Sequence, residues 1–236
     1  ANPSNTIASN GALSYIKIDA NNDNQIDVSE ALQITTLNVS IADIYDLTGI
    51  EYFTNLRTLN CKQNHITALN VSTLISLKTL LCSLNLLTTL DLTGLTQLNT
   101  LECAENTLTQ INFANATNLQ SLICKFNFLT ALDTNSLLNL HTLQCDFNQL
   151  STLNISSLTQ LTTLSCPSNQ LTTLNLSSLV NLTTLNCAHN QFTTLDLSNL
   201  DNLSTLNCGH NQITSLDLTN LTNLSQLNCE SNLIGN

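Results

Sequence analysis

The sequence predicts a solenoid, in which short coils stack along one axis and each coil adds one β-strand to a parallel sheet. A nine-residue frame, Leu-x-x-Leu-x-Cys-x-x-Asn, first occupies residues 56–64 and then recurs every 21 residues. Apolar and polar residues alternate through the first part of the frame, which is the period of a strand with one buried face. A repeat array grows by adding coils, so the 236 residues predict one continuous domain.

Each repeat contributes one cysteine and one asparagine at fixed positions. The cysteines are Cys61, Cys82, Cys103, Cys124, Cys145, Cys166, Cys187, Cys208 and Cys229, and the asparagines are Asn64, Asn85, Asn106, Asn127, Asn148, Asn169, Asn190, Asn211 and Asn232. We expect the thiols to face the core and to stack about 4.8 Å apart on successive strands. Their odd number, the absence of a Cys-x-x-Cys spacing and the poor aim of Cβ atoms on parallel neighbours favour buried free thiols. We expect the asparagine side chains to hydrogen-bond the turning backbone within and between coils.

The frame resembles the leucine-rich repeat, with Cys in the place usually held by the last Leu of the strand. The rest of each repeat, as in Leu174, Leu176 and Leu179, has a short Leu-x-Leu-x-x-Leu spacing that is not helical. We therefore predict a leucine-rich repeat solenoid with a parallel β-sheet on its concave face and extended or 3₁₀ turns on its convex face. Residues 44–55 are similar to the first coils of internalin-like and Bacteroidetes-type surface proteins.

The chain divides into four predicted segments. Residues 1–33 form a small helical N-terminal cap, residues 34–55 a first irregular coil, residues 56–223 eight repeats of 21, and residues 224–236 a partial ninth repeat. We expect the polar residues up to about Gly11 to form a loose end. A solenoid needs a polar cap over its last coil. The ninth repeat is cut short without such a C-terminal cap, which predicts a piece of a longer protein.

Residues 19–30 resemble a calcium loop of the EF-hand or dockerin type. The resemblance implies six ligand positions: Asp19, Asn21, Asp23, the backbone carbonyl of Gln25, Asp27 and a bidentate Glu30. Asn24 stands where such loops usually have Gly, and Asn is the non-glycine residue that best tolerates a left-handed turn. Short helices are expected on either side, over residues 13–18 and 28–32. A bound Ca²⁺ would hold the cap together; the alternative is an acidic turn that caps a helix beginning near Val28 without a metal.

The variable positions between the fixed leucines and cysteines form a candidate ligand-binding site. We expect them to point outward from the strands of the concave face, and near the middle of the chain they are large or charged: Leu81, Leu84, Glu102, Glu105, Ile123, Lys125, Phe126, Gln144, Asp146 and Phe147. Phe126 and Phe147 hold the same slot in successive coils and should be neighbours. Exposed aromatic and aliphatic side chains rimmed by charge are typical of a protein-binding patch. The alternative is drift of the repeat, in which Phe126 leans into an enlarged core.

Composition and motifs argue against several other functions. The formal net charge is −11 with only five Lys and Arg, whereas binding to nucleic acid needs clustered positive charge. No apolar run approaches the roughly 20 residues of a membrane helix, so no membrane insertion is expected. Glu102 and Glu105 form a carboxylate pair without a cleft that would tune it for acid–base catalysis. His189 and His210 share one slot without a third metal ligand, and no nucleophile stands beside a base, so an enzyme is not predicted.

The family resemblance implies a function that the spacing of residues does not. Proteins similar to this one are secreted or surface-displayed bacterial proteins that bind host proteins or glycans, or attach cells to surfaces. We therefore expect a monomer, extracellular or on the bacterial cell surface, that acts as a non-enzymatic recognition or adhesion module and binds a host protein or glycan on its concave face. One alternative is a structural spacer that displays another, catalytic domain. A second is ice binding by threonine arrays such as Thr172, Thr173, Thr193 and Thr194.

Overall fold

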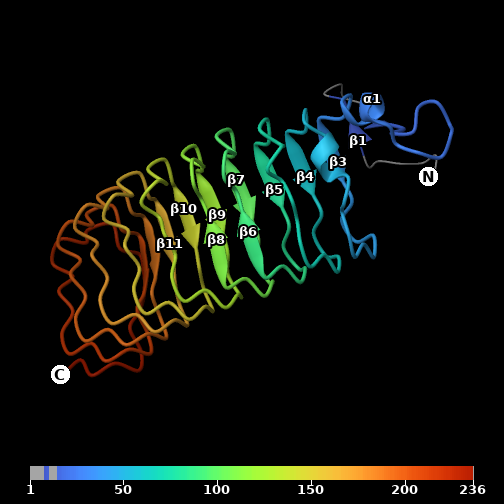
Figure 1. Ribbon diagram of the computed structural model, residues 1–236. Helices are drawn as coiled ribbons and strands as arrows, with labels where there is room; N and C mark the ends of the chain where they lie inside the picture. Colours follow the sequence, from blue (N-terminus) through green and yellow to red (C-terminus); the bar gives the residue numbers. More distant parts are fainter. Residues whose placement is uncertain (1–7, 11–14, 236) are drawn as a thin grey trace.

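The computed structural model describes residues 8–10 and 15–235, and there the repeats wind into an elongated solenoid (Figure 1). Each coil contributes one three-residue strand to a long sheet. These strands are β3 Thr36–Asn38, β4 Thr58–Asn60, β5 Thr79–Leu81, β7 Thr100–Glu102, β9 Ser121–Ile123, β10 Thr142–Gln144, β11 Thr163–Ser165, β12 Thr184–Asn186, β13 Thr205–Asn207 and β14 Gln226–Asn228. They are parallel and follow chain order, so the predicted parallel sheet of a leucine-rich repeat solenoid is confirmed.

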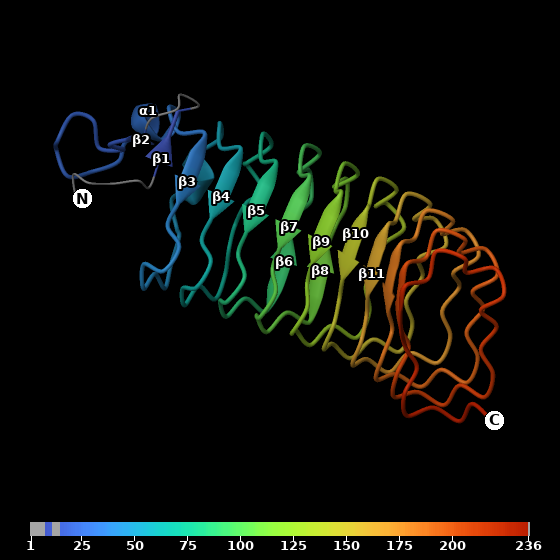
Figure 2. The ribbon, with the colours of Figure 1, turned by 180° about the vertical axis from the view of Figure 1, so that it is seen from behind.

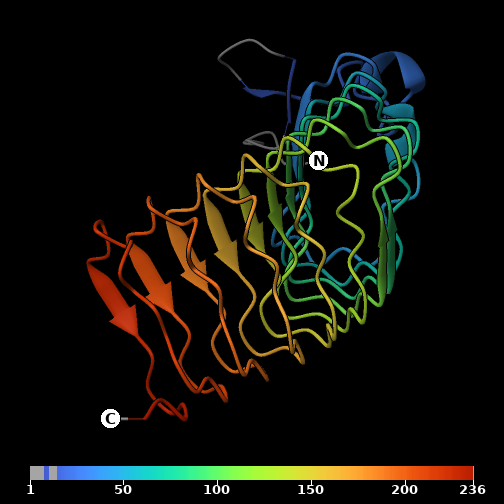
Figure 3. The same cartoon turned by 90° about the vertical axis from the view of Figure 1, so that its left-hand side faces the viewer.

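The strand register follows the sequence repeat. Leu143 pairs with Leu164, 21 residues later, whereas Leu37 and Leu59 of the first two coils are 22 residues apart, as expected for a longer first coil. In β4 and in the strands from β5 to β13 of the long sheet, the middle residue is buried and its two neighbours are half-buried. The strands lie side by side along one side of the coils (Figure 3). One face of the sheet therefore lines the core, and the other faces solvent.

The cysteines lie in the core as predicted. Those from Cys61 to Cys208 are free and fully buried, and Cys229 in the last coil is partly exposed. Burial raises the pKa of the Cys124 and Cys166 thiols to about 12. These side chains therefore remain neutral thiols and pack as small apolar groups among the leucines.

The repeated asparagines join successive coils through hydrogen bonds to the main chain. In Asn148, the side-chain nitrogen donates to the carbonyls of Cys124 and Cys145 at 3.1 and 3.0 Å, and the side-chain oxygen accepts the Leu129 N–H at 3.0 Å. The same pattern repeats at the neighbouring positions, for example at Asn127. Buried N–H and C=O groups in the turns after the strands thus have hydrogen-bond partners, as the sequence predicts.

Figure 2 shows the solenoid with the long sheet toward the viewer, and the other side of each coil contains little regular structure. β6 Thr89–Asp91 and β8 Gln110–Asn112 pair in a two-stranded parallel sheet, and η1 Ile50–Tyr52 is a short 3₁₀ helix. Apart from η1, the described residues contain one helix, α1 Val28–Ala31. The prediction of extended or 3₁₀ segments without long helices is therefore confirmed. Among the residues that the structure describes, no helix has the length and apolar character needed to cross a membrane.

The N-terminal cap differs in part from the prediction. β1 Ala8–Ser9 pairs antiparallel with β3 of the first coil and with β2 Tyr15–Ile16. The expected loose end is therefore wrong for β1, because its backbone pairs with an otherwise open sheet edge and Ala8 is fully buried. Residues 1–7 and 11–14 lie outside the described part. The first flanking helix is wrong where β2 lies, whereas the second is confirmed by α1.

The asparagine hydrogen bonds predict a large loss of stability in Asn148→Ala. The substitution leaves the buried Leu129 N–H without its acceptor and removes the bonds to two carbonyls, so we expect a loss of about 2–4 kcal/mol in the free energy of unfolding. Urea denaturation measures this loss. The control is Asn175→Ala, because the Asn175 side chain accepts only the exposed N–H and hydroxyl of Ser177. Equal losses in the two variants would contradict the proposed role of the asparagines.

Candidate recognition surface

After every parallel strand of the long sheet comes a residue whose backbone adopts the left-handed conformation, with positive φ. These residues form a row that we call the turn ridge: Ile41, Gln63, Leu84, Glu105, Phe126, Phe147, Ser168, His189, His210 and Ser231, with φ between 51° and 59°. The conformation lets the backbone continue the pairing, since the Phe126 N–H donates to the Asp146 carbonyl at 2.9 Å. A left-handed residue other than Gly or Asn carries a cost of about 1 kcal/mol. Even so, no position of the turn ridge is Gly or Asn.

The middle of the turn ridge carries large apolar side chains that face solvent. We define the apolar patch as Leu84, Leu86, Phe126, Phe128 and Phe147, whose exposed fractions lie between 43% and 50%. The Phe126 and Phe147 rings are stacked, with centroids 4.4 Å apart and planes 9° apart. Their predicted proximity is confirmed, and Phe126 does not lean into the core. Isolated exposed apolar residues are ordinary on protein surfaces, but the three phenylalanines lie in two adjacent coils, and such a group is typical of a binding surface. Leu84 and Leu86 lie two coils earlier, with Glu105 in the coil between.

The predicted site residues divide between two surfaces. Leu81, Glu102, Ile123 and Gln144 lie at the ends of strands on the half-buried outer face of the sheet. Leu84, Glu105, Phe126 and Phe147 lie on the turn ridge, and Lys125 and Asp146 stand between the two groups. The expectation that the two phenylalanines occupy strand positions was therefore wrong. From β4 onward, each strand of the long sheet ends after three residues, and the chain then turns and places the ladder asparagine inside the coil.

Charged groups accompany the apolar patch. Glu102 forms an ion pair with Lys62 two coils away, while Glu105 is exposed on the turn ridge. Burial raises the pKa of Asp146, although a hydrogen bond from Ser165 and the charge of Lys125 act in the opposite direction. Within the described residues, the buried Oδ1 atom of Asp146 has no hydrogen-bond partner. An unpaired buried carboxylate oxygen is costly, which agrees with the raised pKa of Asp146.

Sequence reasoning missed Leu86 and Phe128, which contribute two of the five side chains in the apolar patch. Each directly follows a ladder asparagine, in a slot that holds glutamine in four later repeats. Comparison of this one slot across the repeats would have found both residues. Their contribution to the patch required the structure, because it places the slot beside the turn ridge.

The predicted calcium loop folds around its own backbone. The carboxylate of Glu30 accepts N–H groups from Ala20 at 2.6 Å and Asp27 at 3.2 Å, and the Asp27 carboxylate accepts the Glu30 N–H at 3.1 Å. Lys17 Nζ lies 3.2 Å from Asp19 Oδ2. Asn24 has φ of 69°, so the expected left-handed turn is present. No three or more His, Cys, Asp or Glu side chains among the described residues are gathered closely enough to hold a metal ion.

Asn21 and Asp23 complete the description of this loop. The side-chain oxygen of Asn21 accepts the Asp23 N–H at 2.9 Å, and Asp23 accepts the Gln25 N–H at 2.8 Å. The donor set consists of oxygen atoms, as Ca²⁺ requires, and the turn at Asn24 matches such a loop. Against this, the Lys17 ammonium group competes for Asp19, and Glu30 is committed to backbone N–H groups. The residues fit a calcium loop in type and in turn geometry.

Two other repeated features lie on the surface. The His189 and His210 rings stack with centroids 4.1 Å apart, and His210 Nε2 lies 3.5 Å from Glu230 Oε1. The predicted threonine arrays, Thr172, Thr173, Thr193 and Thr194, are all exposed. Within the described chain, the strands on that side of the coils are β6 and β8, which lie in earlier coils. These threonines therefore have no sheet beneath them.

Comparisons with solved structures identify proteins of the same fold. The functional domain of InlJ from Listeria monocytogenes, described as including a cysteine ladder, is 34% identical, with a TM-score of 0.69 and coverage of 86% of this chain and 50% of that one. A leucine-rich repeat protein of Leptospira interrogans is 26% identical, with a TM-score of 0.82 and coverage of 88% and 58%. Internalin C2 from Listeria monocytogenes is 29% identical, with a TM-score of 0.67 and coverage of 75% and 82%.

No protein-family model and no curated protein match the sequence. The chain spans only 50% and 58% of the first two structures. Together, the fold and these comparisons define the class of protein: a leucine-rich repeat solenoid with 21-residue repeats, whose structural neighbours are bacterial internalin-like proteins.

The turn ridge predicts a stabilising substitution, Ser168→Asn. Ser168 has φ of 55°, and Asn tolerates this conformation better than Ser, so we expect a gain of about 0.5–1 kcal/mol in the free energy of unfolding. Urea denaturation measures the gain. The control is Ser151→Asn, an exposed position outside the left-handed set, where no gain is expected. If the two variants change the free energy of unfolding equally, the left-handed turn carries no cost.

Proposed function

We propose that this chain is a non-enzymatic recognition module of a secreted or cell-surface bacterial protein, and that it binds a host protein through the apolar patch. The observation that carries the proposal is the pair of stacked, half-exposed phenylalanines at left-handed positions. At such positions Asn or Gly would serve the backbone better. Two stacked aromatic side chains at strained, solvent-facing positions are better explained by binding than by folding.

The groups around the patch indicate the chemistry of the partner. Glu105 is exposed on the turn ridge, and Asp146 is half-buried directly before Phe147. The chain as a whole has a net charge of −11. A partner surface that combines apolar side chains with Lys or Arg would fill the patch, pair with these carboxylates and be attracted at a distance.

The proposal includes no catalytic step. Glu102 is ion-paired with Lys62, and Glu105 is exposed on a turn, so the two carboxylates do not share a desolvated cleft. The structural spacer stays an alternative, since a solenoid of this kind could display another domain. Ice binding by the threonine arrays also stays a prediction, but no feature of the structure favours it over recognition.

Substitution of both aromatic residues tests the proposal. In the double variant F126N/F147N, Asn suits the left-handed backbone, which offsets the lost ring stacking, so we expect a stability within about 1 kcal/mol of the wild type. Immobilised wild-type chain should retain a partner from host serum or membrane extracts, and the double variant should lose at least about 90% of that partner. Quantitative mass spectrometry of the retained proteins measures the loss.

The matched control is S168N/S231N, which makes the same kind of substitution on the turn ridge outside the apolar patch. This variant should retain the partner as the wild type does. Equal retention by wild type and F126N/F147N would place binding elsewhere. If the wild-type chain retains no partner, the spacer alternative is favoured.

We also propose that residues 19–30 bind one structural Ca²⁺ through Asp19, Asn21, Asp23, Gln25, Asp27 and Glu30. Support comes from the oxygen donors and the left-handed Asn24. An ion that binds only the folded chain adds about 2.7 kcal/mol of stability at a free concentration of 100 times its Kd. EGTA should therefore lower the Tm of the wild type measured by circular dichroism.

Asp19→Ala should remove this EGTA effect, because Asp19 supplies the first ligand position. Asp196→Ala is the control, since Asp196 is an exposed carboxylate far from the loop, and its hydrogen bonds come from the backbone and side chain of Ser198. It should leave the EGTA effect unchanged. An identical wild-type Tm with Ca²⁺ and with EGTA would refute calcium binding.

A further inference from the structure

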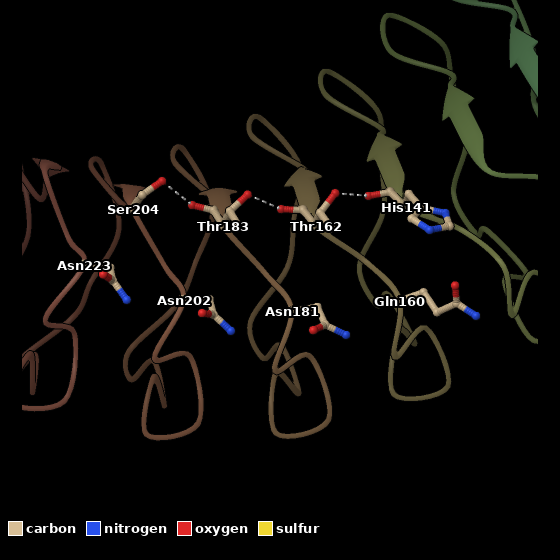
Figure 4. Close-up of a pocket in the computed structure, with 8 residues that line it drawn as sticks. All are labelled: His141, Gln160, Thr162, Asn181, Thr183, Asn202, Ser204 and Asn223. Carbon is tan, nitrogen blue, oxygen red and sulfur yellow. Dashed lines mark hydrogen bonds between the residues drawn. The ribbon is translucent and has the colours of Figure 1, made fainter.

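A polar groove lies at the opposite end of the strands from the apolar patch. Its volume is about 700 Å³, and one residue per coil contributes to each of its two walls (Figure 4). One wall, the hydroxyl row, consists of Thr162, Thr183 and Ser204, each directly before a strand of the long sheet. The other wall, the amide row, consists of Gln160, Asn181, Asn202 and Asn223.

Each hydroxyl group of the hydroxyl row already donates its proton in a hydrogen bond to a main-chain carbonyl. Thr162 donates to the His141 carbonyl, Thr183 to the Thr162 carbonyl and Ser204 to the Thr183 carbonyl, each at 3.0 Å (Figure 4). A hydroxyl group has one proton and two acceptor lone pairs. The oxygen atoms of this row are therefore fixed in position and can offer further hydrogen bonds only as acceptors.

The three asparagines of the amide row are fixed in a similar way. The side-chain nitrogens of Asn181, Asn202 and Asn223 donate to main-chain carbonyls of the preceding coil at 3.0, 2.9 and 2.7 Å. Each amide therefore keeps its oxygen as an acceptor and one N–H as a donor. At one end of the groove, His141 Nδ1 lies 2.8 Å from the Asn139 carbonyl, which can only accept. That contact places a proton on Nδ1 and leaves Nε2 for a ligand.

This inventory restricts the ligand. The lining contains no Asp, Glu, Lys or Arg and is rich in acceptors, so an anionic polymer such as a nucleic acid or a uronic-acid chain would find few donors and no cation. The groups repeat once per coil, about 4.8 Å apart. An extended peptide advances about 3.3 Å per residue and would not keep in step with this repeat. A pyranose residue in an extended chain advances by nearly one coil and carries several hydroxyl donors.

We propose that this groove binds a neutral, linear oligosaccharide, with about one sugar residue per coil. Sugar hydroxyls donate to the oxygens of the hydroxyl row and the amide row, and the remaining amide N–H groups donate to sugar oxygens. The groove differs from the outer strand face on which the sequence predicts a ligand. It is also separate from the apolar patch, which lies beyond the opposite ends of the strands and in earlier coils.

The test is isothermal titration calorimetry of the intact chain with cellohexaose, mannohexaose and hexagalacturonate. The wild type should bind at least one of the two neutral hexasaccharides and should not bind the anionic one. The variant T162V/T183V removes two acceptor oxygens and should weaken binding about tenfold. N181A/N202A alters the opposite wall with exposed side chains and should weaken binding as well, so the test does not depend on one variant.

The matched control is T172V/T193V, which makes the same change at exposed threonines outside the groove. It should bind as the wild type does, and so should F126N/F147N, because the apolar patch is separate from the groove. The latter result would distinguish failure of the protein-binding proposal from failure of this one. Absence of heat with both neutral hexasaccharides at millimolar concentration would overturn the proposal. Equal weakening by T172V/T193V, or equally strong binding of hexagalacturonate, would also overturn it.

Discussion

The hydrogen bonds of the buried asparagines are the constraint on which the rest of the structure depends. From Cys61 to Cys208, each Cys carbonyl accepts from the asparagine of its own coil and from that of the next, as Cys124 does from Asn127 and Asn148. The bonds fix the spacing of the coils and end each strand after three residues. In every coil that carries this asparagine, the residue before it is left-handed. From Gln63 onward, each turn-ridge residue therefore directly precedes an asparagine whose bonds hold the core closed.

This arrangement explains how a chain with only 9% charged residues can adopt one defined fold. Neutral hydrogen bonds between side chains and backbone recur in every coil, at the asparagines and at the hydroxyl row, as with Asn148 and Thr183. These bonds act within one coil or between neighbouring coils, as expected for a repeat protein. The thiols and leucines then fill the interior without any demand for paired charges.

The sequence predicted the features that depend on the period and missed those that depend on contacts between coils. Leu143 and Cys145 were predictable as core because their spacing repeats. The exposure of Phe126 was also predictable, but its place on a turn was not, since strand length is set by the asparagine bonds. Ala8 has no repeat to identify it, because its burial results from pairing with an open sheet edge. The polar groove was not predicted, because its binding character depends on which side-chain hydroxyl and amide groups already donate hydrogen bonds to backbone carbonyls.

The two candidate surfaces therefore differ in their relation to the fold. Residues of the turn ridge, such as Phe147, have their side chains in solvent, so their identity can change with little effect on the core. Residues of the groove, such as Thr183 and Asn202, are bonded to the preceding coil, and a ligand would meet groups that are already immobilised. Preorganised groups lose less entropy on binding. The turn ridge is thus suited to variation between partners, whereas the groove is suited to a regular, uncharged polymer whose repeat matches that of the coils.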